Sequence, residues 1–468
     1  MDDELVWLSA GTLARGYERG DFSPVEVAAA TFRRIHAIDG KLNAFRVLDE
    51  DRAMEAARAS EQRWLKGAPL SAIDGVTATI KDLFAVAGHA TRRGSRTSAD
   101  VVDVDDAPAT ARLRAAGAII LGKTTTPEFG WKGVTDSPLT GTTRNPWNLA
   151  KTPGGSSGGA SAAAAAGMGV LNLGTDGGGS IRIPAAFAGI FGHKPSFGRV
   201  PYYPPSPMGT LAHAGPLTRT VADALLMLNA LMGEDTQDWS TLPSTPIHAA
   251  SLNGGIKGLR VAWSPAMGHA RVDPEVAARA GEAVAVLREL GAEVEQADPP
   301  GGDPVEIFDT LWISGAFGAL RNLPAGQRAE LDPGLAGVLE RAARIDLGQY
   351  MDAQRARFVY ASNIKQFMTR FDILVTPALA VPAFDVDRLV PEGWTIESPN
   401  AWVAWTPFSY PFNLTQQPAC SVPCGFTAEG LPVGLQIVGR MFDDATVLRA
   451  AHAFQQAMPL FDRHPDIA

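Results

Sequence analysis

The sequence predicts an α/β fold in which helices cover both faces of a central sheet. Strand-like and helix-like segments alternate from Gly75 to the end of the chain, and this alternation is typical of such a sheet. The composition is that of a globular protein, with 46% hydrophobic and 19% charged residues. A chain of 468 residues is long enough for about three domains, but large α/β folds often form one unit. We therefore expect a single domain over 1–468.

The first segment, 1–70, is expected to be helical. Ser23 precedes a proline and is followed three residues later by Glu26. This is the pattern of a capping box, in which the serine accepts a hydrogen bond from the first turn and the glutamate bonds back to the serine amide. Phe22 and Val27 stand where a hydrophobic staple would close the same helix start. A helix is therefore predicted to begin at Pro24.

The remaining elements follow from apolar runs bounded by glycine, proline and aspartate. In chain order we expect a helix over 110–116, strands over 118–121 and 257–263, a helix from Asp273 to near Gly291, strands over 292–296, 371–375 and 434–438, and a helix from Asp443. Two stretches rich in proline and glycine, 201–207 and 299–304, are expected to be long loops. The sequence contains no internal repeat and no segment typical of a disordered linker.

The charge balance argues against nucleic-acid and membrane partners. The formal net charge is −9 and the lysines and arginines form no cluster, whereas nucleic-acid binding usually needs a basic face. The acidic start, MDDELVWLSA, lacks the positive region of a signal peptide, and no apolar run reaches about 18 residues. Cys420 and Cys424 lie four residues apart, too far along a strand for a bridge, and are expected to be reduced and buried. A cytoplasmic protein is the expectation.

Residues 150–195 carry the strongest indication of function. Two Gly-Ser clusters, Gly154–Gly159 and Gly177–Ser180, bracket an alanine-rich segment that is expected to form a tightly packed helix with Ser161 as its N-cap. Glycine lets backbone amides approach a ligand closely. A hydroxyl held in such a loop, beside a helix start, can act as a nucleophile next to an oxyanion site. Ser180 fits this description, because it follows three glycines and precedes a plausible helix.

Three motifs in order give a resemblance to a known family. They are Lys81 in VTATIKDLF, Ser156 in PGGSSGG and Ser180 in GTDGGGSIR, separated by 75 and 24 residues. The pattern resembles the amidase signature family, hydrolases with a Ser–cis-Ser–Lys triad, over roughly 9–457. The resemblance implies the amidase signature fold, with a mixed, mainly parallel sheet and a signature core over 75–230. It also implies a hydrolase of carbon–nitrogen bonds in linear amides that needs neither metal nor cofactor.

The resemblance assigns a role to each of the three motif residues. Ser180 would be the nucleophile, and Ser156, which in the family follows a cis peptide bond, would pass its proton to Lys81. The oxyanion hole would be formed by the backbone amides of Gly177, Gly178, Gly179 and Ser180. Lys81 can act as a base only when neutral, so its pKa must fall from about 10.4 to near 7–8 through burial among apolar neighbours.

A different mechanism is also open to the same motif. Residues 154–158, GGSSG, match the G-x-S-x-G nucleophile elbow, which would make Ser156 the nucleophile of a Ser-His-acid triad with His452. The elbow lacks a preceding β-branched strand, so this alternative is less favoured. Asp176 and Arg182 are interpreted as an orienting ion pair rather than as reactants. Metal and nucleotide chemistry are not expected, because the sequence has no H-E-x-x-H, no Cys/His cluster and no P-loop.

Two positions depart from the family pattern. Gly177 stands where the family usually has a larger residue, so the oxyanion loop is expected to be more flexible. Gln416 stands where many members have glycine, which would alter one wall near the C-terminal part of the site. Residues 303–366 diverge as well and are expected to form a helical insertion or cap over the site.

The substrate pocket is expected to be apolar. Candidate substrate-binding residues are Gly130, Trp131, Trp402 and Trp405, with 202–208 as a further wall. Five aromatic residues within 402–412 could line a pocket for an acyl or aryl group, although Phe412 is expected in the core.

The favoured function is hydrolysis of an aryl or acyl amide through an acyl-enzyme on Ser180. Hydrolysis of a carbamate (urethane) is the first alternative. A glutamine-dependent amidotransferase subunit, which would need a partner protein and a polar pocket, is the second. The expected partner is a small-molecule amide or carbamate, and the chain is expected to be a monomer or homodimer.

Overall fold

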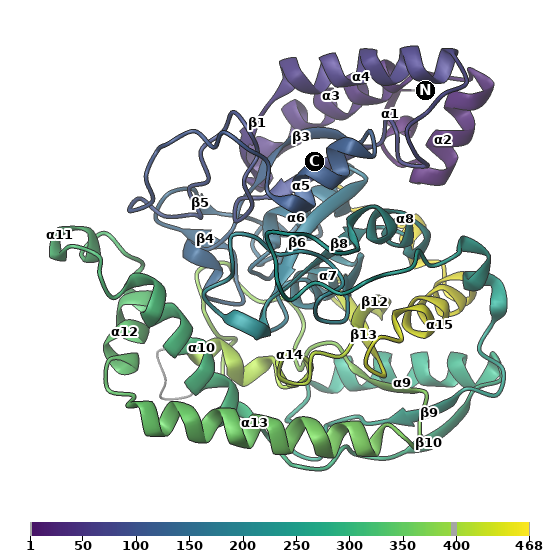
Figure 1. The fold of residues 1–468 in the computed structure, drawn as a ribbon. Helices are drawn as coiled ribbons and strands as arrows, with labels where there is room; N and C mark the ends of the chain where they lie inside the picture. Colours follow the sequence, from purple (N-terminus) through teal and green to yellow (C-terminus); the bar gives the residue numbers. More distant parts are fainter. Residues whose placement is uncertain (1, 395–399, 468) are drawn as a thin grey trace.

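The computed structural model describes residues 2–394 and 400–467, and a mixed sheet lies at its centre with helices on both faces (Figure 1). This agrees with the predicted fold class. The strands of this sheet are β1 (Phe45–Leu48), β2 (Thr77–Lys81), β3 (Ile119–Thr124), β6 (Leu171–Asp176), β7 (Phe191–Lys194), β8 (His213–Thr218), β9 (Arg260–Trp263), β10 (Glu293–Gln296), β11 (Ile373–Pro377), β12 (Ala419–Phe426) and β13 (Pro432–Gly439). Two further short strands, β4 (Asp136–Ser137) and β5 (Gly141–Thr142), pair with each other.

The order of the eleven strands is β1-β3-β2-β6-β8-β7-β12-β13-β11-β9-β10. β3, β2 and β6 are parallel neighbours, as are β11, β9 and β10. All six other neighbouring pairs in this described sheet are antiparallel. The sheet is therefore mixed, as predicted, but the expectation that it is mainly parallel is wrong. Short returns such as 427–431, between β12 and β13, can join only antiparallel neighbours.

The helices are distributed along the whole chain. They are α1 (Asp2–Leu5), α2 (Ala10–Arg19), α3 (Pro24–Leu42), α4 (Glu50–Leu65), α5 (Pro108–Ala115), α6 (Gly158–Ala165), α7 (Arg182–Ala188), α8 (Val221–Leu231), α9 (Pro274–Glu289), α10 (Val305–Leu320), α11 (Ala325–Arg328), α12 (Pro333–Ala342), α13 (Leu347–Phe367), α14 (Pro411–Leu414) and α15 (Asp444–Ala457). Within the described residues, no helix is both long enough and apolar enough to cross a bilayer.

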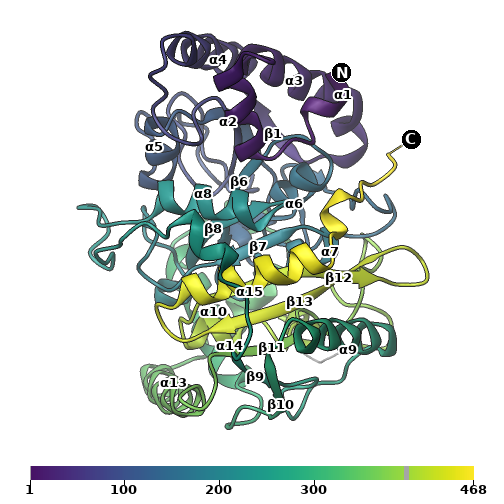
Figure 2. The ribbon, with the colours of Figure 1, turned by 90° about the vertical axis from the view of Figure 1, so that its right-hand side faces the viewer.

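The helices α7 and α15 show how both faces of the sheet are covered. A Cβ built on Gly434 of β13 meets Ala186 of α7, whereas one built on Gly439 meets Val447 of α15. Successive residues of a strand point to opposite faces, so the odd spacing of the two glycines places the two helices on opposite sides. Figure 2 shows α15 lying along β12 and β13, with α8 and α9 beside it.

The N-terminal helices begin as the sequence predicts. Ser23 accepts a hydrogen bond from the Glu26 amide, and the Glu26 carboxylate accepts one from the Ser23 amide at 2.7 Å, which completes the capping box of α3. Asp273 and Asp443 likewise cap α9 and α15 through their side chains. The two ends of the described chain meet where the ring of Trp7 stacks on that of His464, with centroids 3.8 Å apart.

The other predicted elements are found within a few residues of their expected bounds, and 201–207 and 299–304 are irregular. Cys420 and Cys424 are free and buried in β12, as expected. The assignment of Ser161 as an N-cap is wrong. Ser157 precedes the first residue of α6, whereas Ser161 lies inside the helix and donates to the Gly158 carbonyl. Every residue of α6 is buried, so its small side chains let it pack closely between the site loops and the sheet.

Residues 303–366 form α10, α11, α12 and α13. In Figure 1, α13, the longest of these helices, runs along the lower edge of the molecule, and α11 and α12 lie at its left side. The α10 helix packs against α12 and α13, and its inner side carries Phe308 and Trp312, both buried. This segment therefore supplies apolar side chains to the region where the three motifs meet.

Candidate active site

Lys81 ends β2 and is fully buried. Its Nζ donates to three hydroxyl oxygens: Ser156 Oγ at 2.7 Å, Ser157 Oγ at 2.9 Å and Thr175 Oγ1 at 2.9 Å. The structure thus brings together Lys81 and Ser156, two of the residues named from the sequence motifs. It adds Ser157, the next residue in the same loop as Ser156, and Thr175, near the end of the adjacent strand β6.

The environment of Lys81 favours the neutral amine. Burial lowers the pKa of Lys81 well below its ordinary value, and the charge of Asp176 opposes this effect without reversing it. No carboxylate lies among the three hydrogen-bond partners. A neutral amine can donate two hydrogen bonds and accept one, so it can accept the Ser156 proton while it donates to the other two hydroxyls.

Ser156 lies in a loop where backbone segments approach closely. The Gly155–Ser156 peptide bond is cis, as the resemblance implied. A Cβ built on Gly155 would lie 2.6 Å from the Val134 carbonyl, and one on Gly130 would lie 3.3 Å from Ser156 Oγ. Glycine is therefore required at residue 155 for packing, and Gly130 leaves open the space next to the Ser156 hydroxyl.

Ser180 lies in the loop between β6 and α7 and is 5% exposed. Its carbonyl accepts a hydrogen bond from the Ser157 amide at 3.2 Å, which joins the two glycine-rich loops. Ser156 and Ser180 line the same cavity, but no hydrogen bond between their hydroxyls is present in the described structure. The two serines therefore line one cavity, and of the two only Ser156 is hydrogen-bonded to Lys81.

The backbone amides of 177–180 are not equivalent. The Gly179 amide donates to Asp176 Oδ1 at 2.8 Å, so it is already engaged within the protein. Among the described residues, no acceptor binds the amides of Gly177, Gly178 or Ser180. Of the four amides expected to form the oxyanion hole, that of Gly179 is therefore bound to the Asp176 carboxylate, and the other three have no protein acceptor in the described structure.

Close packing explains why glycines occupy this loop. Gly179 has a φ of 127°, and a Cβ at this position would lie 2.5 Å from Ser409 Oγ. A Cβ on Gly178 would lie 2.7 Å from Phe308 Cζ. The Ser409 hydroxyl donates to the Gly178 carbonyl at 2.7 Å. The loop is therefore held from outside by side chains that leave no room for any residue larger than glycine.

Asp176 and Arg182 form a buried ion pair at 2.9 Å. Burial favours the neutral form of Asp176, but the Arg182 guanidinium holds the pKa of that carboxyl well below its usual range. Asn413 Nδ2 also donates to Asp176 at 2.8 Å, and Arg182 donates to Ser409 and Gln436. These contacts fit the expected role of the pair as a brace of the Ser180 loop, since neither residue lines the cavity.

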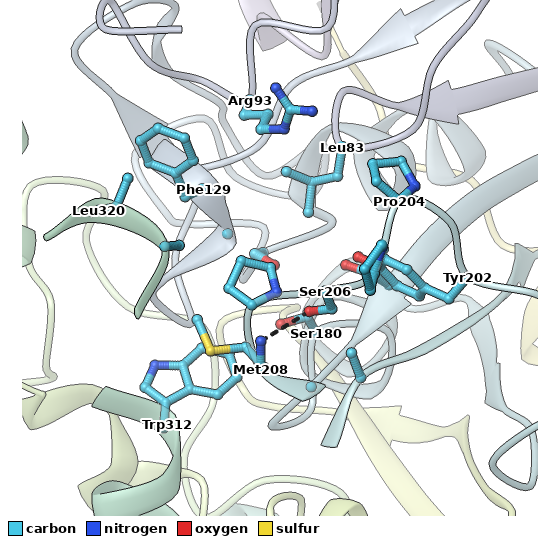
Figure 3. Close-up of a pocket in the computed structure, with 18 residues that line it drawn as sticks. Leu83, Arg93, Phe129, Ser180, Tyr202, Pro204, Ser206, Met208, Trp312 and Leu320 are labelled. Atoms are coloured by element: carbon cyan, nitrogen blue, oxygen red, sulfur yellow. Dashed lines mark hydrogen bonds between the residues drawn. The ribbon is translucent and has the colours of Figure 1, made fainter. Parts of the chain in front are cut away.

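The two serines open onto a cavity of about 310 Å³ (Figure 3). Gly130 and the segment 202–208 contribute to its walls, as expected, except for Tyr203. Its lining residues are Leu83, Arg93, Phe129, Gly130, Ser156, Thr175, Gly177, Ser180, Tyr202, Pro204, Pro205, Ser206, Pro207, Met208, Ala212, Trp312, Ala319 and Leu320. Most of these side chains are apolar.

The tryptophans named from the sequence lie outside this lining. Trp131, Trp402 and Trp405 are at most 1% exposed and none of them lines the cavity. Trp405 stacks on Phe187 with centroids 5.6 Å apart, and Trp402 meets the ring of Trp312 at 5.6 Å. An aromatic run suits a core as well as a pocket, and here it packs behind the glycine loop. Trp312, which does line the cavity, comes from α10, a helix whose sequence carries no site motif.

The two departures from the family pattern have different surroundings. Next to Gly177, the space for a side chain is taken by Trp312, whose Cζ3 lies 2.9 Å from a Cβ built there. The expected extra space for loop movement is therefore filled. Gln416 does not line the catalytic cavity. Its Nε2 donates to the Thr210 carbonyl at 3.0 Å, and it faces a separate surface groove.

The nucleophile-elbow alternative finds no support in these contacts. Ser156 has Lys81 as its partner rather than a histidine, and His452 lies on α15, outside the cavity lining. In the described part of the chain, no group of three or more His, Cys, Asp or Glu side chains is arranged to hold a metal ion.

The comparisons with known proteins agree with this geometry. The family model described as Amidase matches residues 26–448. The chain is 40% identical to an acylamidase of Rhodococcus erythropolis, over 99% of this chain and 98% of that protein. It is 36% identical to a glutamyl-tRNA(Gln) amidotransferase subunit of Chloroflexus aggregans, over 99% of both. The solved structure of a bacterial aryl acylamidase belonging to the amidase signature enzymes is similar over 98% of both chains, with a TM-score of 0.89 and 31% identity.

Proposed function

The chain belongs to the amidase signature family and is an amidase, a hydrolase acting on carbon–nitrogen bonds, and we propose that it cleaves aryl or acyl amides with apolar groups through an acyl-enzyme on Ser180. The observation that carries this proposal is the 2.7 Å contact between Lys81 and Ser156 beside a cavity that Ser180 also lines.

Lys81, Ser156 and Ser180 divide the proton transfers between them. Ser180 Oγ attacks the carbonyl carbon while its proton passes to Ser156, whose own proton passes to the neutral amine of Lys81. The same groups return a proton to the departing nitrogen, so that a neutral amine leaves. Water then attacks the acyl-enzyme by the same route and releases the carboxylic acid and Ser180.

The tetrahedral intermediate needs donors for its negative oxygen. The amides of Gly177, Gly178 and Ser180 are available, because no protein acceptor in the described structure binds them. Preorganised backbone donors of this kind stabilise the developing charge without reorganisation, and the loss of one typically costs about 10²–10³ in turnover. Asp176 and Arg182 act as positioning residues, since their contacts fix the loop that carries these amides.

The lining of the cavity supports an apolar substrate. Leu83, Phe129, Met208, Trp312 and Leu320 present apolar surface to it, and burial of an aryl or alkyl group against such walls is favourable at roughly 25 cal/mol per Å². The relatives named acylamidase and aryl acylamidase agree with this substrate class. Glutamine has a polar side chain and two charged groups, which this lining suits less well.

The proposal is tested with the purified chain and three substrates. We expect release of 4-nitroaniline from 4-nitroacetanilide, and of ammonia from glutamine only at a far lower rate. A 4-nitrophenyl N-alkylcarbamate presents a carbonyl to the same oxyanion site and tests the urethane alternative. If kcat/KM is higher for the carbamate than for the anilide, the preferred substrate is a carbamate rather than an amide. Ammonia release from glutamine without anilide cleavage would favour the amidotransferase alternative.

A further inference from the structure

The catalytic cavity carries one charged side chain among its described lining residues, that of Arg93. Arg93 lies in the loop after β2, and its Nη1 donates to the Thr91 carbonyl at 3.2 Å. No carboxylate pairs with it in the described part of the structure. The neighbouring Arg92, by contrast, pairs with Asp100 at 3.1 Å. Arg93 therefore brings a charge that no described acidic group pairs with to a cavity whose other described lining side chains are uncharged.

The backbone holds Arg93 in an unusual conformation. Arg93 has a φ of 54° and Phe129 a φ of 52°, a region that non-glycine residues rarely adopt. The Phe129 amide donates to the Arg93 carbonyl at 2.8 Å, and both residues line the cavity. This hydrogen bond joins the loop that carries Arg93 to the loop that carries Phe129, where both line the cavity. Residues held in this conformation cluster at ligand sites.

The position of Arg93 separates it from the reacting serine. In Figure 3, Arg93 and Phe129 lie on one side of the pocket, while Ser180 and Met208 lie on the other, with Leu83 between the two sides. A group bound by Arg93 would therefore belong to a part of the substrate away from the scissile bond. The apolar side chains between the two sides suit a hydrocarbon or aryl spacer.

We propose that Arg93 is a specificity-determining residue that binds a carboxylate at the end of the substrate distant from the scissile amide. This inference rests on the proposed function and names its substrate class more closely. A guanidinium offers paired donors that match the two oxygens of a carboxylate. A wholly apolar substrate would cover the Arg93 charge without giving it an acceptor, which is unfavourable. An amide with an apolar spacer and a terminal carboxylate satisfies both parts of the cavity.

The test compares matched substrates with and without the carboxylate. On the acyl side, the mono-4-nitroanilides of succinic, glutaric and adipic acid are compared with neutral 4-nitroanilides in which an isopropyl group replaces the carboxylate. On the amine side, 4-acetamidobenzoate is compared with 4-isopropylacetanilide. On at least one side, we expect the carboxylate to raise kcat/KM by roughly tenfold to a hundredfold, mainly through KM, because Arg93 binds a group that does not react.

Variants of Arg93 test whether this residue causes the preference. Arg93→Met keeps an unbranched side chain at the same backbone conformation and should abolish the preference, while Arg93→Lys, which keeps the charge but not the fork, should retain part of it. Arg92→Met, whose parent side chain lies outside the cavity lining, is the matched control and should keep the wild-type ratio. High salt should lower the ratio in the wild type, because it screens a partly exposed ion pair.

Each outcome has a separate meaning. Hydrolysis of the neutral anilides with no carboxylate preference on either side overturns the inference and leaves the proposed function in place. The same conclusion follows if Arg93→Met keeps the wild-type preference. No hydrolysis of any anilide, neutral or charged, overturns the proposed function and the inference with it.

Discussion

The indole ring of Trp312 fills the space next to Gly177 that a larger residue would need, with Cζ3 only 2.9 Å from a Cβ built on the glycine. Gly177 lies in the loop that carries Ser180, and Trp312 comes from α10, far away in the sequence. The indole of Trp312 can therefore occupy this position only because residue 177 has no side chain. Both line the catalytic cavity, so the pair also sets its shape.

This relationship predicts strong coupling between the two positions. Gly177→Thr should lower kcat/KM sharply, because the new side chain collides with the indole and displaces the oxyanion loop. Trp312→Ala in the same chain should recover part of the loss by making room. Residues in contact typically show coupling energies of about 0.5–3 kcal/mol, which a double-mutant cycle on kcat/KM would measure with 4-nitroacetanilide. Simple additivity of the two effects would contradict the pairing.

Ser180→Ala should remove essentially all turnover and leave the fold intact. The substitution deletes one small hydroxyl that makes no side-chain hydrogen bond in the described structure, so its effect on stability is expected to be small. The matching measurement is covalent labelling with a fluorophosphonate followed by mass spectrometry of the peptides. We expect the adduct on Ser180. An adduct on Ser156 would instead revive the nucleophile-elbow mechanism.

Activity should rise with pH through the lowered pKa of Lys81. Burial lowers that pKa well below 10.5, and only the neutral amine can accept the Ser156 proton, so the rate is low below the pKa and stays high above it. Lys81→Ala should lose several orders of magnitude in kcat/KM. Lys81→Arg should not restore activity, because a guanidinium remains charged. The measurements are a pH–rate profile of the wild type and the turnover of both variants. Substantial turnover in Lys81→Arg would exclude the base role.

The same shift predicts how Lys81 affects stability. Between its lowered pKa and 10.5, the unfolded chain binds a proton that the folded chain does not. The contribution of Lys81 to the free energy of unfolding therefore rises with pH across this window and is smallest below the folded-state pKa. Urea unfolding of the wild type and of Lys81→Met at several pH values would reveal this slope as a difference between the two proteins.

Thr175 is expected to position Lys81. An ammonium group offers three donors, and the hydroxyls of Ser156, Ser157 and Thr175 accept all three. Thr175→Val leaves one donor without an acceptor, which should lower the pKa of Lys81 further, shift the acidic limb of the pH–rate profile to lower pH and reduce kcat by roughly tenfold. Thr79→Val is the matched control, since Thr79 lies on the same strand as Lys81 but bonds to Asn172. An unshifted profile in Thr175→Val would contradict this role.

Local sequence signals predicted much of the fold and brought attention to Lys81 and Ser156, which are in contact. The capping box at Ser23 needs only four consecutive residues, and it is present. The motifs around Lys81 and Ser156 are also local, and the structure brings these two residues to 2.7 Å. Glycine has no side chain, so a glycine-rich loop already indicates that another backbone segment approaches closely, as Val134 does at Gly155.

The remaining features depend on contacts between distant segments. Nothing in the sequence around Trp312 or Arg93 distinguishes a cavity wall from an ordinary surface or core position, and both residues line the cavity. The engagement of the Gly179 amide by Asp176 depends on the loop conformation rather than on residue type. The aromatic run at 402–412 was predicted to line a pocket, but its hydrophobicity fits a core equally well, and the sequence alone does not distinguish the two. Which side of a loop an aromatic ring faces is decided by the elements that pack against it.

The aromatic run should therefore affect stability, and the cavity wall should affect specificity. Trp405 is fully buried, stacks on Phe187 and donates to the Leu389 carbonyl at 3.1 Å. Trp405→Ala should cost about 3–5 kcal/mol of stability, and the milder Trp405→Phe should cost less, with the ratio of kcat/KM for 4-nitroacetanilide and a hexanoyl 4-nitroanilide unchanged in both.

Met208 gives the opposite expectation. It lines the cavity and is only partly buried, so Met208→Ala should change the melting temperature little but enlarge the space beside the substrate. One wall contact is worth about 1–3 kcal/mol, or roughly 10–200-fold in discrimination, and the longer acyl chain should gain. Thermal unfolding and the two anilides measure both effects on the same proteins. If Trp405→Phe shifted the substrate ratio and Met208→Ala did not, the substrate would bind against the aromatic run, and the cavity around Ser180 would not be its binding site.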